Sequence, residues 1–132
     1  MKDFDFFNDD KLVDALLVEV AGLLSLLIDQ GEEAAIDLLG LPLSPARFAE
    51  LERRLGRGEI NIQIDAFGRS EIFETRFPGV WWTQHVDEAG RVIARLIEVA
   101  FVPNILRADV EDIKRGRDQL LAATKTSSRS AA

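Results

Sequence analysis

The sequence predicts an α+β domain in which helices pack against an antiparallel sheet. Residues 10–30 and 45–55 carry apolar side chains at helical spacing, whereas residues 59–102 alternate apolar and polar side chains in four runs. Turn-forming residues separate those runs, so we expect an antiparallel four-stranded meander sheet. A long N-terminal helix, a second helix and a C-terminal helix are expected to pack mainly on one face of this sheet.

The first predicted helix runs from about residue 10 to Gln30. Asn8, Asp9 or Asp10 can cap its start, and Gly31 supplies its stop. Its apolar positions cover two adjoining stripes, which is wider than a minimal amphipathic face. These positions are Leu12, Val13, Leu16, Leu17, Val20, Leu23, Leu24, Leu27 and Ile28. Such a helix lies under the sheet on one side and a partner on another, or is deeply buried in its own domain.

Residues 34–38 favour a short strand, which is not one of the four strands of the predicted meander. A loop at residues 41–45 then leads into the second helix. Ser44 is a good N-cap residue, and Pro45 suits the first helical position. Gly56 is expected to end this helix.

Four strands are predicted in the second half of the chain, where the hydrophobic period changes. The runs are residues 59–65, 70–76, 80–86 and 91–102. Pro78 and Gly79 form a turn or bulge, and residues 87–90 have the composition of a hairpin loop. Pro103 ends the last strand, because proline cannot donate to a sheet ladder.

A final helix begins at about Ala108 and has a modest apolar face. The small, polar and charged residues after it are typical of a disordered tail. We therefore predict an N-terminal extension at residues 1–9, a single α+β domain at residues 10–123 and a disordered tail at residues 124–132. The length of 132 residues suits one hydrophobic core.

Composition excludes several classes of function. The chain has no cysteine, which excludes disulfides, thiolate metal sites and cysteine nucleophiles. Its formal net charge is −7, so nucleic acid is not an expected partner. The acidic side chains favour basic partners or simply solvate the protein. An acidic start and short apolar runs predict a cytoplasmic protein without membrane insertion.

The most distinctive segment is Arg76 to Trp82, which reads Arg-Phe-Pro-Gly-Val-Trp-Trp. If Trp81 and Trp82 lie on a strand, their side chains point to opposite faces, so one fills the core and the other stands exposed. Aromatic side chains dominate binding interfaces, and we expect this segment to contact a protein partner. Which tryptophan is exposed stays open, as does the alternative that both are buried.

Catalytic and metal chemistry have little support in this sequence. His85 is the only histidine, and no second His or Cys completes a typical metal site. Glu98 interrupts an apolar strand and is interpreted as a cross-strand partner of Arg76 or Arg95, or as a solvated residue. We expect no catalytic residue, no bound metal and no cofactor.

Several separated segments carry a family resemblance. They are residues 41–45 (LPLSP), 55–59 (LGRGE), 74–82 (ETRFPGVWW), 97–99 (IEV), Pro103 and 105–106 (IL). In this order they resemble the C-terminal conserved domain of the HupH/HyaF-type hydrogenase expression/formation proteins, over about residues 10–122. The resemblance implies a non-catalytic accessory protein in nickel–iron hydrogenase maturation. It also implies a partner, which is the iron–sulfur small subunit precursor or another maturation factor.

We therefore predict a chaperone-like protein that binds its client through one group of residues. The predicted protein-binding residues are Arg76, Phe77, Pro78, Gly79, Trp81, Trp82, His85 and Glu98. One alternative is a homo-oligomeric interaction module that forms a homodimer through the first helix. A less favoured alternative is a metal-handling protein that uses His85.

Overall fold

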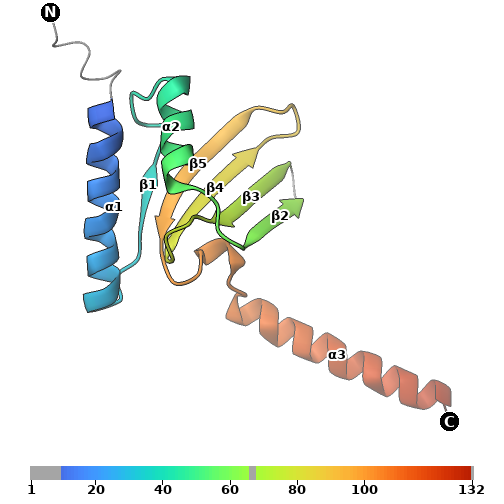
Figure 1. Cartoon of the computed structure of the whole chain (residues 1–132). Coiled ribbons are helices and arrows are strands. Elements are labelled where there is room, and N and C mark those ends of the chain that lie inside the picture. The colour runs from blue at the N-terminus through green and yellow to red at the C-terminus, as the bar shows by residue number, and fades with distance from the viewer. Residues whose placement is uncertain (1–9, 66–67, 132) are drawn as a thin grey trace, which may run out of the picture.

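The computed structural model describes residues 10–65 and 68–131, and it follows the predicted order of helices and strands. The elements are α1 (Asp10–Gln30), β1 (Ala34–Asp37), α2 (Pro45–Leu55), β2 (Asn61–Asp65), β3 (Arg69–Glu74), β4 (Val80–Val86), β5 (Val92–Val99), η2 (Asn104–Leu106) and α3 (Val110–Ala131) (Figure 1). The α+β class is confirmed.

Within the described residues the sheet has five strands, so the prediction of four is wrong. Its order is β1-β5-β4-β3-β2, and all neighbouring strands are antiparallel. The additional strand is β1, which pairs with β5 at the edge of the sheet, from Ala34 opposite Val99 to Asp37 opposite Leu96. A four-residue strand with one buried side chain has too short an alternation to reveal its partner from sequence.

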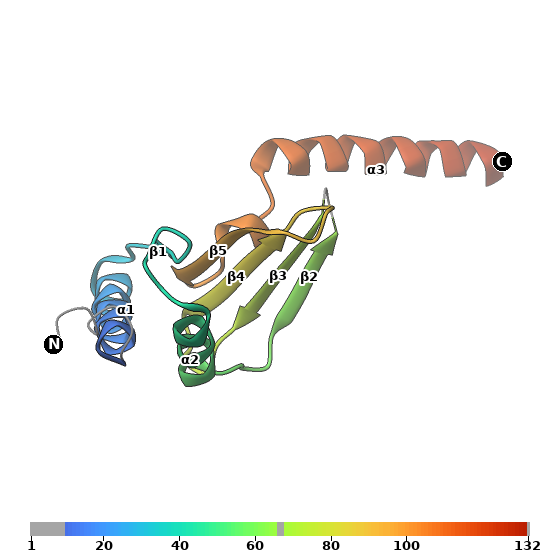
Figure 2. The same ribbon diagram turned by 90° about the horizontal axis from the view of Figure 1, so that it is seen from above.

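Helices α1 and α2 lie on one side of the sheet, which we call the covered face (Figure 2). Here the rings of Phe73 and Trp82 stack with centroids 6.2 Å apart. The other fully or largely buried core residues are Val13, Leu16, Val20, Leu27, Ile36, Leu38, Leu51, Leu55, Val80, Ile97 and Val99. Burial of apolar surface is worth about 25 cal/mol per Å², so this cluster is the main source of stability.

The ends of α2 follow the predicted capping residues. Ser44 Oγ accepts a hydrogen bond from the Arg47 N–H (3.2 Å), and Pro45 begins the first turn. At the other end, Gly56 adopts a φ of +68° and its N–H donates to the Glu52 carbonyl oxygen (2.9 Å). These contacts fix the point at which the chain leaves the helix for β2.

Helix α3 leaves on the opposite side of the sheet, which we call the open face, and extends away from the domain (Figures 1 and 2). Residues 110–125 are all exposed, so the expectation that the C-terminal helix packs on the sheet is wrong for this part of the chain. Its apolar face is narrow, as noted from the sequence. Although α3 runs to Ala131, past the predicted domain end at residue 123, the division into extension, domain and tail stays a prediction. The extension at residues 1–9 lies outside the described residues.

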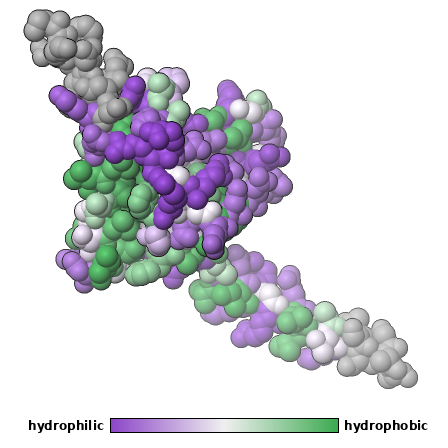
Figure 3. Space-filling model, in the orientation of Figure 1, coloured by the Kyte–Doolittle hydropathy of each residue, from purple (hydrophilic) through white to green (hydrophobic). Residues whose placement is uncertain are grey.

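The two apolar stripes of α1 have different surroundings. One stripe packs into the core, and Leu17, Leu23 and Leu24 beside it are only partly buried. Elsewhere on the helix, Val18 and Ile28 are 72% and 77% exposed. Figure 3 shows apolar surface over the α1 side of the molecule and in patches along α3. A membrane-spanning helix needs about 20 apolar residues, and none in the described chain has both the length and the apolarity required.

Candidate functional site

The distinctive Arg-Phe-Pro-Gly segment forms the turn between β3 and β4. Thr75 organises this turn, because its hydroxyl donates to the Val80 carbonyl oxygen (2.9 Å) and accepts from the Phe77 N–H (3.2 Å). The Val80 N–H in turn donates to the Phe77 carbonyl oxygen (3.0 Å). Gly79 has a φ of +89°, a conformation that other residues adopt only with strain. The backbone of Phe77 is therefore held by several contacts.

A second segment braces the same turn from outside. The Arg76 N–H donates to the carbonyl oxygen of Leu55 (3.0 Å), and the Gly58 N–H donates to that of Glu74 (2.7 Å). A Cβ atom on Gly58 would lie 2.7 Å from the Thr75 carbonyl oxygen, which is closer than packing allows. Gly58 is thus explained by its close approach to the backbone of the turn, and Gly56 by its positive φ and its approach to the Arg76 side chain.

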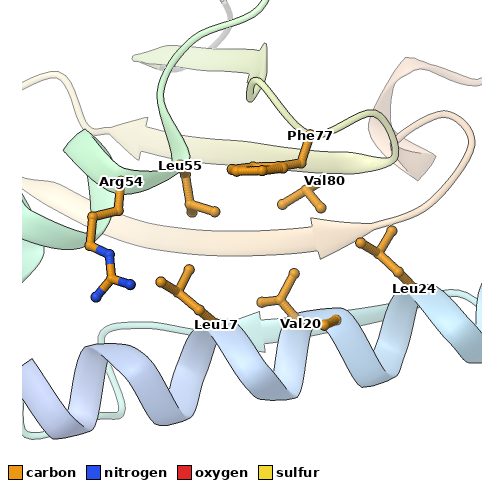
Figure 4. A pocket seen from close by; sticks show the side chains of 8 residues that line it. Leu17, Val20, Leu24, Arg54, Leu55, Phe77 and Val80 are labelled. Atoms are coloured by element: carbon orange, nitrogen blue, oxygen red, sulfur yellow. The ribbon is translucent and has the colours of Figure 1, made fainter.

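An apolar groove of about 260 Å³ lies between α1 and this turn. It is lined by Leu17, Val20, Ala21, Leu24, Arg54, Leu55, Phe77 and Val80. In Figure 4, Leu17, Val20 and Leu24 point up from α1 toward the ring of Phe77. Because Phe77 is 46% exposed, its ring is accessible to a partner in a groove that is otherwise built from core-forming elements.

Charged side chains lie at one end of the groove. Arg54 lies there (Figure 4) and pairs with Asp14 of α1, with Nη1 and Oδ1 2.5 Å apart. The Arg76 guanidinium donates to the Arg54 carbonyl oxygen (3.0 Å), and its carbon lies 5.8 Å from the centre of the Phe77 ring. The lining offers no acid–base pair or nucleophile, so this arrangement suits binding of an apolar segment.

The two tryptophans point to opposite faces, as predicted, but both are buried. Trp82 is 2% exposed in the core, and Trp81 is 5% exposed on the open face. The chain that follows β5 lies against Trp81, whose indole N–H donates to the Ala100 carbonyl oxygen (3.0 Å). The expectation of an exposed tryptophan is therefore wrong, because this return of the chain was not visible in the periodicity.

The remaining predicted residues lie on the open face. Trp81, Thr83 and His85 share that face, as their alternation predicts. His85 Nδ1 lies 2.7 Å from the Ser70 hydroxyl, and the Thr83 hydroxyl donates to Glu98 Oε1 (2.9 Å).

Glu98 therefore pairs with a hydroxyl, and the predicted pairing with Arg76 or Arg95 is wrong. Arg95 instead donates to Gln84 (2.8 Å) and lies over the ring of Phe48. Among residues 10–65 and 68–131, no three His, Asp or Glu side chains cluster in a way that could hold a metal ion.

The eight predicted binding residues thus separate into three places. Arg76, Phe77, Pro78 and Gly79 form the turn beside the groove, Trp82 lies in the core, and Trp81, His85 and Glu98 lie on the open face. Their assignment to client binding stays a prediction. Sequence reasoning missed Thr75 and the α1 side of the groove, although the second apolar stripe of residues 10–30 was a signal for the latter.

Comparison with protein families gives a match over most of the chain. Residues 12–126 match the family described as "HupH hydrogenase expression protein, C-terminal conserved region". A solved structure, that of the hydrogenase expression protein HupH from Thiobacillus denitrificans, is similar with a TM-score of 0.83 and 38% identity. The similarity covers 86% of this chain and 95% of that one.

Curated relatives share the same description. The hydrogenase expression/formation protein HoxQ of Azotobacter vinelandii is 33% identical over 86 residues, which is 65% of this chain and 30% of that protein. HupQ of Azotobacter chroococcum is 31% identical over 85 residues, or 64% of this chain and 30% of that protein. The chain therefore spans about a third of the length of these relatives.

Proposed function

This chain belongs to the family of the HupH hydrogenase expression protein C-terminal conserved region, and from that premise we propose that it is a non-catalytic accessory protein of hydrogenase maturation. It acts in the cytoplasm as a chaperone-like factor that binds a protein client. The curated relatives are named for hydrogenase expression and formation, which supports the process but names no client.

The observation that carries this proposal is the apolar groove beside Phe77. An exposed aromatic ring in a rigid turn, facing the leucines of α1, is the kind of anchor that dominates protein–protein binding. Apolar side chains of a client segment fill such a groove, and backbone carbonyls or a carboxylate contact the arginine end.

The client we propose is the iron–sulfur small subunit precursor of a nickel–iron hydrogenase. The net charge of −7 attracts a basic segment of a precursor and speeds encounter with it. An apolar stretch of that precursor then occupies the groove. Because the longer relatives contain further sequence, the role of this chain in the whole process is part of the proposal.

The test is calorimetric titration of the small subunit precursor into the full chain. Phe77→Ser removes the exposed anchor and should weaken binding by about tenfold or more, because truncated hot-spot residues typically cost over 1.4 kcal/mol. Phe101→Ser is the matched control, since Phe101 is 69% exposed and does not line the groove. Equal affinity of the wild type and Phe77→Ser, with both folded by circular dichroism, would remove the groove from the proposal.

The alternative of a homodimer through α1 is favoured by one observation, the exposure of Val18 and Ile28. Val18→Glu would place a charge in such an interface and shift the chain toward the monomer. Sedimentation of this variant at several concentrations is the check, and an unchanged mass distribution would remove α1 as the interface.

A further inference from the structure

Helix α3 carries an apolar stripe that nothing in the described chain covers. Val110, Ile113, Leu120 and Leu121 are between 54% and 69% exposed and lie on one side of the helix, as their spacing of three and seven residues requires. Most helical stability in proteins comes from packing of an apolar face rather than from helix propensity. We therefore expect the stripe to pack against another apolar surface.

The open face of the sheet has a matching unoccupied surface. A hollow of about 560 Å³ crosses all five strands there. Its lining includes Ala35, Ile64, Ser70, Thr83, Leu96 and Glu98, with Ile105 of η2 at its border. The surface is largely apolar, and Glu98 is the carboxylate among its lining residues. We call this surface the open-face hollow.

We propose that α3 of one copy of this chain docks across the open-face hollow of a second copy, and that the second copy returns the same contact. Both surfaces lie on the same side of the molecule, since α3 departs from η2 on the open face (Figure 2). A reciprocal exchange of this kind is an isologous contact with two-fold symmetry, so it closes as a dimer.

The two surfaces complement each other in length. From Val110 to Leu121 the stripe extends about 17 Å at 1.5 Å per residue. Five strands at about 4.8 Å spacing give the sheet a width of about 19 Å. The stripe can therefore contact every strand that lines the open-face hollow.

They also complement each other in charge. Arg117 lies within the stripe, four residues after Ile113 and four before Leu121. In the single chain Arg117 donates to the adjacent Asp118 (3.1 Å), an exposed contact of little energetic value. Across the dimer it meets Glu98, which is half-buried in the hollow and has a hydrogen bond from Thr83. A buried carboxylate is stabilised when it gains a second, charged partner.

A second copy is favoured over the chain's own sheet by the direction in which α3 leaves the domain (Figure 1). The Asp109 side chain accepts from the Glu111 N–H (3.0 Å), and its carbonyl oxygen accepts from the Ile113 N–H (3.0 Å). These contacts cap the first turn of α3, and in the structure the capped helix leads away from its own sheet (Figure 1).

Sedimentation velocity of the full chain, over about a hundred-fold range of concentration, measures the dimer dissociation constant. We expect a monomer–dimer equilibrium. Arg117→Glu brings two carboxylates together and should raise the constant by about tenfold or more. The double variant Arg117→Glu, Glu98→Arg restores opposite charges and should return it to within about threefold of the wild type. Arg115→Glu is the matched control, because it makes the same charge change on the opposite side of α3.

A cross-linking experiment identifies the surfaces even if Glu98→Arg does not fold. A mixture of nitrogen-15-labelled and unlabelled chains is treated with a zero-length carbodiimide, which joins amines to carboxylates in contact. Links of mixed isotope between Lys114 of α3 and Glu98 or Glu74 of the open face are the expected result.

Three results would overturn the proposal. The first is a chain that stays monomeric throughout. The second is a set of α3–sheet links of single isotope, which would mean that α3 folds onto its own sheet. The third is a dimer that dissociates with Val18→Glu but not with Arg117→Glu, which would place the interface on α1.

Discussion

The covered face and the open face belong to the same five strands but are shielded in different ways. On the covered face, Trp82 stacks on Phe73 beneath α1 and α2. On the open face, the adjacent Trp81 is shielded by a return of the chain and held through one hydrogen bond to Ala100. Two neighbouring tryptophans are thus equally buried but unequally supported. The covered face contributes most of the stability, and the open face leaves surface available for contacts.

The largest expected effects on stability are those of the two tryptophans. Trp82→Ala removes a ring that two helices enclose and should lower the free energy of unfolding by about 3–5 kcal/mol. Trp81→Ala should cost about 2–3 kcal/mol, because the short segment over it can relax into the space. Urea unfolding of both variants measures the two values. Equal losses would mean that the open face is supported as firmly as the covered face.

The two terminal helices extend the same comparison. Leu16→Ala in α1 creates a cavity against the covered face and should cost about 2–4 kcal/mol. Ile113→Ala in α3, measured at a concentration where the chain is monomeric, should stay within about 0.5 kcal/mol of the wild type, since its side chain is exposed. Thermal unfolding followed by circular dichroism checks both. A large loss from Ile113→Ala in the monomer would contradict the position of α3.

The brace of the β3–β4 turn gives the next effect. Gly58→Ala puts a Cβ atom against the Thr75 carbonyl oxygen and should cost about 1–3 kcal/mol. It should also weaken client binding, because Phe77 moves with the turn. Unfolding and titration of one variant measure the two effects together. A loss of stability with unchanged client affinity would mean that the brace does not position Phe77 for binding.

Substitution of two helical glycines should have smaller effects, and these should strengthen the helices rather than destabilise the domain. A Cβ atom on Gly22 of α1 or Gly116 of α3 would meet nothing within 4 Å, so alanine is accommodated at both. Gly22→Ala should raise the free energy of unfolding by about 0.5–1 kcal/mol through helix propensity. Gly116→Ala, measured at a concentration where the chain is monomeric, should increase the helical circular dichroism signal and leave the unfolding midpoint of the domain unchanged. A shift of that midpoint would show that α3 is coupled to the sheet.

The smallest effect belongs to the β4–β5 hairpin, which serves as a reference outside both faces. Hydrogen bonds from the Arg91 N–H, the Arg91 side chain and the Ala89 N–H hold the pKa of the Asp87 carboxyl below its ordinary value. Its contribution to stability is therefore complete above the ordinary value of about 4 and is lost as the pH falls through the lowered pKa. Unfolding of the wild type and Asp87→Ala from neutral to acid pH should show their difference shrinking below about pH 4. A constant difference would contradict the assigned hydrogen bonds.

Much of the fold could be predicted because its signals are local. Ser44, Pro45 and Gly56 act where capping chemistry places them, and the alternation of Ile62 and Ile64 predicts a strand with one exposed face. The partner of β1 could not be predicted, because four residues with one buried side chain carry no register information. The position of α3 was also missed, since an amphipathic stripe indicates that a helix needs a partner but not which partner.

The candidate site shows the same limit in another form. Alternation placed Trp81 and Trp82 on opposite faces, but exposure depended on the chain after β5, which approaches from about 20 residues away in sequence. Phe77 was among the residues named from the sequence and lines the groove, whereas several of its neighbours there come from α1. The need for glycine at position 58 became clear only when the structure placed Gly58 against the Thr75 carbonyl oxygen.

The brace that joins Leu55 and Gly58 to the turn has a thermodynamic consequence for recognition. An anchor on a free loop loses conformational entropy when it is captured, at about 0.5–1.5 kcal/mol for each immobilised side chain and more for the backbone. The backbone beside Phe77 has already lost that freedom on folding, through its contacts with Leu55, Glu74 and Thr75. The entropy cost of ordering on complex formation therefore falls mainly on the client. A flexible precursor can be released again once its own folding buries the apolar residues that the groove had bound.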